Sequence, residues 1–397
     1  MKMLNIGVGT SKEKDPLHAV QEAIRQAKFS MQAKKIDLAI VFGSAEFSHP
    51  LILTAIRKIL GPVSLIGASS MAVISGQGIF RHGLGIMLLS IPEGTYFNTA
   101  CVKDIGSRSA PSVGKELGEK LIHNFKDIRR DLSIVFSDGL IPDGSGLVYG
   151  LQEILGKSFP LAGASASDNL VFKKTHIYFN EEASSDAACG IIWGGKLNFG
   201  LGIQHGWKPL GKMHRVTKSN NNVVYEIDGA PASQIYKDYL NCDLAGLRKE
   251  LKYISIFYPI GMYLEGEKEY LLRNISSIGN DDSLTFQGDV PHGSSIRVMI
   301  GTKESCLQAT EVAIKEAKKD LFGRPITCAF IFDSTSRHIL LGRQVKRELE
   351  IIREGIGKDI PFLGLCTYGE QAPLKAVNYQ GRSHFHNQTI TVVCISN

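Results

Sequence analysis

An internal repeat constrains the fold of this 397-residue chain more than any other feature of its sequence. Three segments show the same order of patterns: an amphipathic helical stretch, an apolar strand-like run, a second helical stretch, a run that contains glycine, and a closing apolar run. The first apolar runs of the three segments are Asp37–Phe42, Asp131–Phe136 and Cys328–Phe332. The glycine-containing runs are Val63–Ser70, Pro160–Ser165 and Pro361–Cys366, and the closing runs are Gly85–Ile91, Cys189–Trp193 and Thr389–Ile395.

The helical stretches complete a unit of helix, strand, helix, strand and strand. They are expected near residues 17–33 and 50–60, 113–125 and 144–155, and 305–320 and 345–353. Any α/β protein shows loosely similar strands, but a matched order of five elements with a shared glycine in the fourth is difficult to obtain by chance. Helices that alternate with buried Val, Ile, Leu and Phe runs predict sheets covered by helices rather than a bundle or a sandwich.

The stretch between the second and third units has a different character. Short runs separated by Gly, Asn and Asp indicate antiparallel sheet; they are Ile254–Phe257, Glu269–Arg273, Ser283–Phe286 and Ser295–Ile300. The turn-rich stretch 206–219 and the three asparagines that follow it place a domain boundary near residue 220.

The chain exceeds the size at which single cores usually stop growing, so two domains are expected, 1–220 and 221–397. The predicted fold class is therefore α/β. It consists of two domains built from repeated helix-strand-helix-strand-strand units, with mixed sheets covered by helices and an antiparallel portion in the C-terminal domain.

Composition excludes several classes of partner. The formal net charge is +6, but the lysines and arginines are scattered beside glutamates and do not cluster with aromatic residues, which disfavours nucleic-acid binding. No apolar run approaches the roughly 20 residues that cross a bilayer. The amino terminus lacks the apolar region of a signal peptide. We therefore expect a cytoplasmic protein without membrane insertion.

The seven cysteines support the same location. They are odd in number, widely spaced and mostly inside apolar runs, as expected of reduced thiols. No CxxC pair exists, and His384 and His386 flank only Phe385, so a structural zinc site would have to be assembled from distant residues. We expect neither a metal nor a cofactor.

Several long motifs resemble the FIST family. The run Pro361–Pro373, followed by His384–Thr389, resembles the terminal signature of the FIST C domain. The start of that domain resembles Asp228–Ala232 with Tyr236, and its middle resembles Arg273 with Gly288–Gly293. The partner FIST N domain resembles Gly7–Thr10, Val41–Phe42 and Ile66–Ser70. Together these motifs cover nearly the whole chain.

The resemblance implies a sensory module that binds small ligands, proposed to be amino acids or similar metabolites. In the family such modules are often joined to signalling outputs in bacteria or to an F-box in eukaryotes. The two expected domains leave no room for an output domain within the 397 residues. We therefore expect the signal to pass through a separate partner protein or a change of assembly, such as formation of a homo-oligomer.

Small polar residues end the glycine-containing runs, where an open α/β sheet places its ligands. Hydroxyl groups there can hydrogen-bond a ligand while the glycine allows close approach. These residues are Ser69 and Ser70, Ser165 and Ser167, and Cys366, Thr367 and Tyr368. The serines have an alternative role, which is to form a tight turn and cap the next element. An aromatic ring and the carboxylate of Glu370 at the third run favour a ligand site there.

Two charged residues suggest how an amino acid would be bound. Arg273, on a position that matches the family, is the candidate for binding a carboxylate, and Glu370 would receive an ammonium group. Alternatively, Arg273 and Glu370 pair with each other or with surface neighbours. His386, Asn387 and Thr389 follow a turn and would either line the pocket or lock that turn.

Other classes of function stay open. Cys366, His386 and Glu370 have the residue types of a nucleophile, a base and an orienting group, which allows a Cys-dependent hydrolase or transferase. No GxSxG, Walker or HExxH pattern appears, so we assign no catalytic residues. A protein-interaction scaffold is the third class, and it would use Tyr236, Tyr239, Phe257 and Tyr258 as exposed aromatics.

Overall fold

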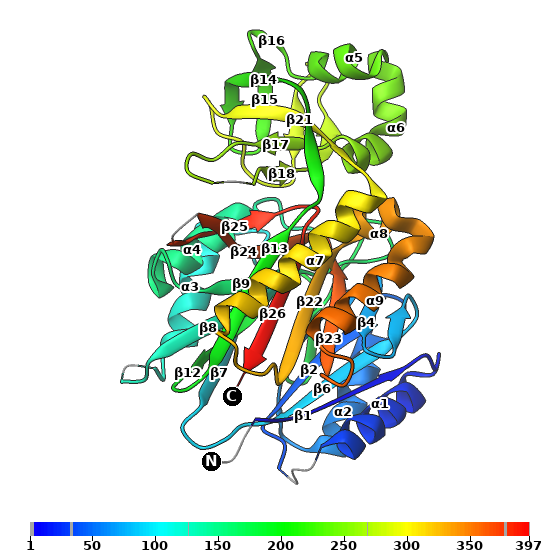
Figure 1. The fold of residues 1–397 in the computed structure, drawn as a ribbon, viewed down its shortest axis with the longest axis vertical. Helices are drawn as coiled ribbons and strands as arrows, with labels where there is room; N and C mark the ends of the chain where they lie inside the picture. Colours follow the sequence, from blue (N-terminus) through cyan, green and yellow to red (C-terminus); the bar gives the residue numbers. More distant parts are fainter. Residues whose placement is uncertain (1–3, 32–34, 126, 268, 377–378, 397) are drawn as a thin grey trace.

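The computed structural model describes residues 4–31, 35–125, 127–267, 269–376 and 379–396. Figure 1 shows a large body below and a smaller lobe above, with the lobe formed by the green-to-yellow part of the chain. Within the described residues the body holds three six-stranded mixed sheets, and the lobe is built on an eight-stranded antiparallel sheet. The predicted fold class, mixed sheets flanked by helices with an antiparallel portion in the C-terminal half, is confirmed.

The first sheet has the strand order β1-β6-β2-β3, in which only β2 and β3 run parallel. Its elements are β1 (Asn5–Ser11), α1 (Pro16–Ser30), β2 (Leu38–Ser44), α2 (His49–Leu60), β3 (Ser64–Ser70) and β6 (Leu84–Ser90). Helix α1 begins at a proline, and the Asp15 side chain caps it by accepting from the N–H of His18. Its buried face consists of Ala, Val and Ile at helical spacing.

The second and third sheets have the same arrangement, β7-β12-β8-β9 and β13-β26-β22-β23. The second is built from β7 (Tyr96–Lys103), α3 (Ala110–Ile122), β8 (Arg130–Ser137), α4 (Gly144–Leu155), β9 (Leu161–Ser165) and β12 (Ala187–Gly194). The third is built from β13 (Asn198–Gln204), α7 (Lys303–Asp320), β22 (Cys328–Ser334), α8 (Thr335–Leu341), α9 (Val345–Ile356), β23 (Phe362–Thr367) and β26 (Ile390–Ser396). In both sheets a helix stands second and fourth in the order of elements. The two central strands, β8 with β9 and β22 with β23, run parallel.

Each sheet is completed by a hairpin from the part of the chain that forms another sheet. The hairpins are β4 (Val73–Ser75) with β5 (Gly78–Phe80), β10 (Ile177–Phe179) with β11 (Glu182–Ser184), and β24 (Gly369–Ala376) with β25 (Tyr379–His386). Strand β4 pairs with β23, β10 pairs with β3, and β24 pairs with β9. The exchange closes a ring of three sheets.

The three sheets share one apolar core at the centre of this ring. Phe42 of β2 meets Phe136 of β8 edge to face at 5.3 Å between ring centroids, and Phe136 meets Phe332 of β22 at 5.8 Å. All three rings are almost fully buried. Edge-to-face aromatic pairs are favourable beyond the area they bury, so these rings fix how the sheets meet.

The glycine of each predicted motif lies in a central parallel pair and permits close approach to the neighbouring strand. Gly67, Gly163 and Gly364 face Val41, Val135 and Ile331 in register. A β-carbon on these glycines would lie 1.8, 2.3 and 2.2 Å from the carbonyl oxygen of the facing residue. Only glycine fits there, which explains the residue shared by the three runs.

The lobe is inserted between β13 and α7 (Figure 1). Its elements are β14 (Trp207–Asn220), β15 (Val223–Ile227), β16 (Ala230–Pro231), α5 (Gln234–Leu240), α6 (Leu244–Phe257), β17 (Ile260–Met262), β18 (Leu271–Arg273), β19 (Ile275–Ile278), β20 (Leu284–Phe286) and β21 (Ser295–Gly301). The expected domain boundary near residue 220 coincides with the end of β14 and stays a prediction.

Two local predictions in this region are wrong. Ile254–Phe257, expected as a strand, is the last turn of α6, because Leu247, Leu251 and Ile254 form an apolar stripe at helical spacing that packs on the core of the lobe. The stretch 206–219, expected to be rich in turns, is mostly the long strand β14, which pairs with β21 and β15.

Of the four aromatics expected to be exposed for a scaffold, Tyr236 is buried and the other three are partly buried. Tyr236 is fully buried, and its hydroxyl donates to the carbonyl of Tyr258 over 2.8 Å. Tyr239 and Tyr258 pack against the core of the lobe, and Phe257 packs against a smaller core at its base. Their role is therefore to fill the lobe.

We expect Gly67→Ala to destabilise the protein by roughly 1–3 kcal/mol or more, because the added methyl overpacks a site bounded by backbone. Gly76→Ala is the matched control, since its β-carbon would meet its nearest neighbour at an ordinary 3.7 Å. Urea unfolding of both variants measures the difference. Equal free energies of unfolding for the two variants would contradict the close approach of β2 and β3.

Candidate functional site

The predicted strand-end residues of the three sheets meet at the carboxyl ends of β3, β9 and β23. Ser70 Oγ accepts from the N–H of Cys366 over 3.0 Å and donates to the carbonyl of Ala72 over 2.6 Å. Ser167 Oγ donates to the carbonyl of Cys366 over 2.5 Å and accepts from the N–H of Met71 over 2.9 Å. These hydroxyl groups join the three sheets to one another.

The remaining two serines have similar partners. Ser69 Oγ accepts from the N–H of His176 over 2.9 Å, and Ser165 Oγ lies 3.1 Å from the hydroxyl of Ser137. All of these serines are at least 98% buried. In this conformation the hydroxyl groups of Ser69, Ser70 and Ser167 satisfy buried backbone groups, whereas that of Ser165 pairs with a side chain. Ligand binding by Ser69 and Ser70 stays a prediction.

Cys366 contacts two residues that the sequence reasoning missed. Its Sγ lies 3.2 Å from Nε2 and 3.5 Å from Nδ1 of His338, and His338 Nε2 lies 2.8 Å from Oδ2 of Asp333. Asp333 faces Cys366 in the parallel register of β22 and β23, and α8 begins directly afterwards and carries His338. His386 and Glu370, expected as partners of Cys366, have other hydrogen-bond partners.

This arrangement differs from a catalytic triad in geometry. In a triad one imidazole nitrogen faces the nucleophile and the other faces the carboxylate, whereas Nε2 of His338 is the nitrogen nearest to both Cys366 and Asp333. Burial raises the pKa of the Cys366 thiol, and His338 offsets this only in part. Burial acts to lower the pKa of His338, but Cys366 and Asp333 raise it well above its usual value.

Arg337 organises the groups around Asp333. Its guanidinium is fully buried and donates to Asp333 Oδ1 over 2.7 Å and to Glu348 Oε1 over 2.5 Å. It also donates to the carbonyls of His205 and Cys306 and to the hydroxyl of Thr310. Asp333 and Arg337 are four residues apart, with Asp333 in β22 and Arg337 in the first turn of α8. That spacing is the one signal in the sequence that points to this cluster.

The two carboxyl groups beside Arg337 respond differently to burial. Burial, together with the nearby Asp333, raises the pKa of Glu348 to about 7. Burial acts to raise the pKa of Asp333 as well, but Arg337 and His338 hold it below its usual value. Asp333 is therefore the carboxylate that carries charge across the neutral range.

Glu370 is fully enclosed between two threonines. Thr367 donates its hydroxyl to one carboxyl oxygen, and Thr389 donates its N–H and hydroxyl to the other over 3.0 and 2.7 Å. Burial raises the pKa of Glu370 to about 8, because these three hydrogen bonds only partly replace water. Arg273 and Glu370 do not share a hydrogen bond in the described structure.

Tyr368 holds the loop that follows β9. Its hydroxyl donates to the carboxylate of Asp168 and accepts from the N–H of Leu170, and its ring stacks on that of Phe172 at 4.6 Å. The Asp168 carboxylate also accepts from the backbone N–H groups of residues 171–174. Leu170 and Phe172 adopt positive φ angles of 63° and 53°. The loop is thus strained locally and held by one carboxylate.

Arg273 lies at the junction between the lobe and the body, completely buried. It donates to the carbonyl of Asp289 over 2.9 Å and to Oδ1 of Asp289 over 3.0 Å, both within the lobe. Towards the body it donates to the carbonyl of Phe385 over 2.9 Å. Tyr149 of α4 donates to the second carboxylate oxygen of Asp289 over 3.0 Å.

The turn that precedes β26 completes this junction. His386 Nε2 lies 2.9 Å from the carbonyl of Ala372. Asn387 accepts from the N–H of Asn274 over 3.3 Å, and Gln388 donates to the carbonyl of Ser255 over 2.8 Å. Arg273, Asn387 and the main chain around them therefore come together at the junction, and ligand binding by them stays a prediction.

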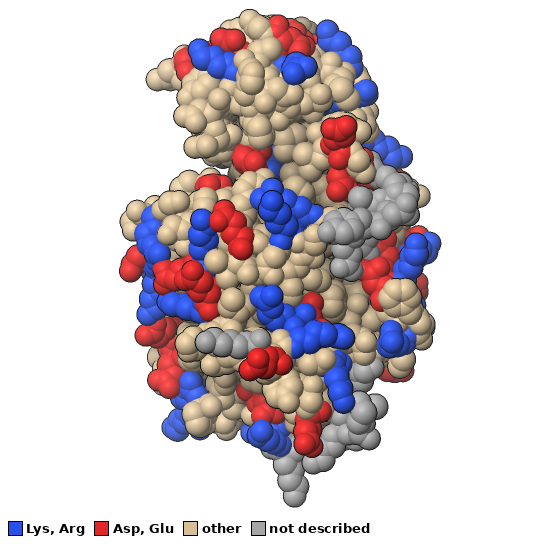
Figure 2. Space-filling view, turned by 90° about the vertical axis from the view of Figure 1, so that its left-hand side faces the viewer, with Lys and Arg blue, Asp and Glu red and all other residues tan. Residues whose placement is uncertain are grey.

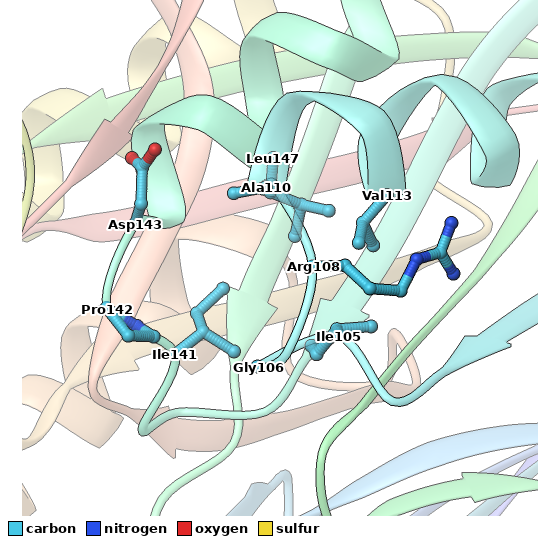
Figure 3. Close-up of a pocket in the computed structure, with 9 residues that line it drawn as sticks. All are labelled: Ile105, Gly106, Arg108, Ala110, Val113, Ile141, Pro142, Asp143 and Leu147. Atoms are coloured by element: carbon cyan, nitrogen blue, oxygen red, sulfur yellow. The ribbon is translucent and has the colours of Figure 1, made fainter.

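Two cavities lie elsewhere, at the carboxyl ends of the first and second sheets. One, of about 380 Å³, is lined by Lys12, Glu13, Lys14, Ser44, Glu46, Phe47 and His82. The other, of about 80 Å³, lies between the loop before α3 and the loop before α4; Figure 3 shows Ile105, Val113 and Ile141 around it, with Asp143 and Arg108 at opposite ends. No residue predicted from the sequence lines either cavity.

Acidic and basic side chains are interspersed on the face displayed in Figure 2, without a single-sign patch. This agrees with the scattered charges of the sequence. Across the described residues, no helix combines the length and the apolar character needed to span a bilayer.

Two family models match consecutive parts of the chain. The FIST N domain matches residues 37–230, and the FIST C domain matches residues 232–373. The chain belongs to the FIST family. FIST domains are in general small-ligand-binding signalling domains.

Several relatives of this FIST protein have been sequenced. It is 26% identical to an uncharacterized protein of Methanocaldococcus jannaschii over 70% of its own length, and the match spans 55% of that protein. It is 20% identical to an uncharacterized protein of Mycobacterium tuberculosis, over 94% of its length and 96% of the relative. A solved cyanuric acid hydrolase is 8% identical, with a TM-score of 0.30 over 99% of this chain and 100% of that chain. That score is too low to support any argument.

The raised pKa of Glu370 predicts a pH-dependent difference in stability. The folded state holds this proton more tightly than the unfolded state does, so Glu370 supports folding fully below about pH 4.5, and that support is lost as pH rises towards about 8. Glu370→Gln has no proton to lose. Its free energy of unfolding should therefore gain on that of wild type between pH 5 and 8, by up to about 1.4 kcal/mol per pH unit.

Urea unfolding at several pH values measures this gain. Glu250→Gln, an exposed position on α6, is the control and should run parallel to wild type. Parallel pH profiles for Glu370→Gln and wild type would show that Glu370 is ionised in the folded state.

The enclosed thiol predicts slow alkylation. Cys366 should react with iodoacetamide only when the protein opens, because its sulfur is fully buried and its pKa is raised. Cys242, which is partly exposed, should react first. Mass spectrometry of a time course distinguishes the two sites, and labelling of Cys366 ahead of Cys242 would favour the nucleophile hypothesis.

Proposed function

We propose that this FIST protein is a cytoplasmic sensor of a small carboxylated metabolite, such as an amino acid, that binds at the junction between the lobe and the body. The signal would pass to a separate partner protein or through a change of assembly. The seven free cysteines are consistent with a cytoplasmic location. The family relationship supports a small ligand but does not identify it.

The observation that carries the proposal is the Arg273–Asp289 ion pair. A buried guanidinium at the junction is paired with one carboxylate over 3.0 Å. A ligand carboxylate has the same shape and charge as the Asp289 side chain and can replace it on the planar fork of Arg273. The Asp289 side chain is 22% exposed, so the place it occupies adjoins solvent.

The same ion pair offers a route from binding to a signal. Arg273 also contacts the body by donating to the carbonyl of Phe385. Asp289 contacts the body twice: its carboxylate accepts from Tyr149, and its backbone N–H donates to Ser145. A ligand that displaces Asp289 releases the contact to Tyr149 while keeping the contact to Phe385. It would therefore favour a different position of the lobe, and a ligand shifts an equilibrium by its difference in affinity for the two states.

The other predicted ligand contacts have different requirements. Asn387 lies at the junction. Its amide nitrogen is as far as 3.5 Å and 3.4 Å from its two acceptors, so these hydrogen bonds are weak. Glu370 and Tyr368 have closer partners. To receive an ammonium group, Glu370 would have to release a threonine hydrogen bond.

A thermal-shift screen of amino acids and central metabolites tests the proposal. A ligand at a hundredfold excess over its Kd adds about 2.7 kcal/mol, which for a chain of this length is a Tm shift of roughly 3 °C. Asp289→Asn should increase the response to carboxylated ligands, because it removes the competing charge from Arg273. Arg273→Gln should abolish the response, and it should also lower the Tm without ligand, because Arg273 is buried with several partners.

Asp282→Asn is the matched control, since Asp282 pairs with Lys237 on the same lobe at 3.0 Å. It should respond as wild type does. The assignment fails if no metabolite shifts the wild type, or if Asp289→Asn and Asp282→Asn respond equally.

A further inference from the structure

Three buried side chains offer ligand atoms to a common point in the third sheet. They are Asp333 at the end of β22, His338 in α8 and Glu348 in α9, and one ligand atom from each lies within 4.8 Å of the others. Their side chains are at least 97% buried. This cluster is separate from the Arg273 junction that carries the proposed function.

One oxygen of each carboxylate in the cluster is held, and the other is free of hydrogen bonds. Arg337 holds Asp333 Oδ1 and Glu348 Oε1, and Thr310 also donates to Glu348 Oε1 over 2.8 Å. Asp333 Oδ2 and Glu348 Oε2 are buried without a hydrogen-bond partner. Asp333 Oδ2 is left with its ion pair to His338 Nε2 at 2.8 Å, so a cation that contacts both carboxylates would add a partner to each of these oxygens.

The contact between Asp333 and His338 supports a cation as that partner. Asp333 Oδ2 and His338 Nε2 are only 2.8 Å apart, yet Oδ2 has no hydrogen bond of acceptable geometry. Ligand atoms of a metal ion lie close together without a hydrogen bond between them, and this pair has that arrangement. Arg337 and Thr310 would then be the outer partners that orient the ligating carboxylates.

Cys366 adjoins this set at its edge, outside the three residues whose ligand atoms lie within 4.8 Å of one another. Its sulfur is 3.2 Å from His338 Nε2. Imidazole, carboxylate and thiolate together suit Zn²⁺ and similar first-row divalent ions rather than Mg²⁺ or Ca²⁺. A divalent cation would also relieve the repulsion between Asp333 and Glu348, to which Arg337 is already paired through one oxygen of each carboxylate.

We propose that Asp333, His338 and Glu348 bind a divalent transition-metal ion of the Zn²⁺ type, with Cys366 as the fourth ligand. The site lies next to the start of the lobe, because Arg337 also donates to the carbonyl of His205, two residues before β14. Metal binding would thus stiffen the point at which the lobe joins the body. The sequence-based expectation of no metal rested on ligand spacing, which cannot reveal residues brought together by folding.

Zinc binding to the full chain tests the site. The protein is first stripped with a chelator and then titrated with Zn²⁺ against a chromophoric competitor. We expect one equivalent per chain and a higher Tm with zinc. Glu348→Gln and His338→Gln should each weaken binding at least about tenfold, since even outer partners of metal sites change affinity by 10–100-fold. Cobalt substitution should give a thiolate-to-metal absorption band that Cys366→Ser removes.

His49→Gln is the matched control, because His49 is also a buried histidine with an unpartnered Nε2 but lies in α2. It should bind zinc as wild type does. Circular dichroism in the presence of chelator shows which variants fold, and the isosteric Glu348→Gln decides the matter if His338→Gln does not. The proposal is overturned if wild type binds no stoichiometric zinc, or if Glu348→Gln and His49→Gln bind it equally. A cobalt complex without the thiolate band would overturn Cys366 as a ligand.

Discussion

The exchange of hairpins between the three sheets is the constraint on which the rest of the structure depends. Each sheet ends in a hairpin contributed by another part of the chain, so no sheet can be completed until the others are in place. The exchange turns the carboxyl ends of β3, β9 and β23 towards one another. It also explains why serine hydroxyls from two sheets satisfy the main chain of Cys366 in the third.

The same closure has an electrostatic consequence. Bringing strand ends together buries the polar side chains that such ends carry, and a buried charge is tolerated only when it is paired and hydrogen-bonded. Arg337 pairs with one oxygen of Asp333 and one of Glu348, and two threonines hydrogen-bond Glu370, whose pKa burial raises to about 8. Where the requirement is met incompletely, as at the free oxygens of Asp333 and Glu348, an additional ligand is the physical expectation.

The inserted lobe contacts the body at a polar junction. It is inserted into the third sheet's run of chain between β13 and α7, and among the described residues its polar contacts to the body include those of Arg273, Asp289 and the turn around Asn387. The third sheet itself combines β13, inside the FIST N match, with β26, which lies beyond the FIST C match. Strands β22 and β23 of the same sheet lie inside the FIST C match, so the two matched regions share a sheet.

The sequence by itself determined the local elements and their class. Apolar runs and helical periodicity are local properties, so β2, β8 and β22 could be read directly, as could the glycines that pack against them. Ile254–Phe257 was read wrongly because a short apolar run fits either a strand or the end of a helix. The partners of Cys366 were decided only by tertiary structure, because the parallel register of β22 and β23 sets Asp333 opposite a residue 33 positions later in the chain. For the same reason Arg273 could be recognised as a candidate from its place in the sequence, whereas its burial against Asp289 and Phe385 depends on how the lobe docks on the body, which no local pattern encodes.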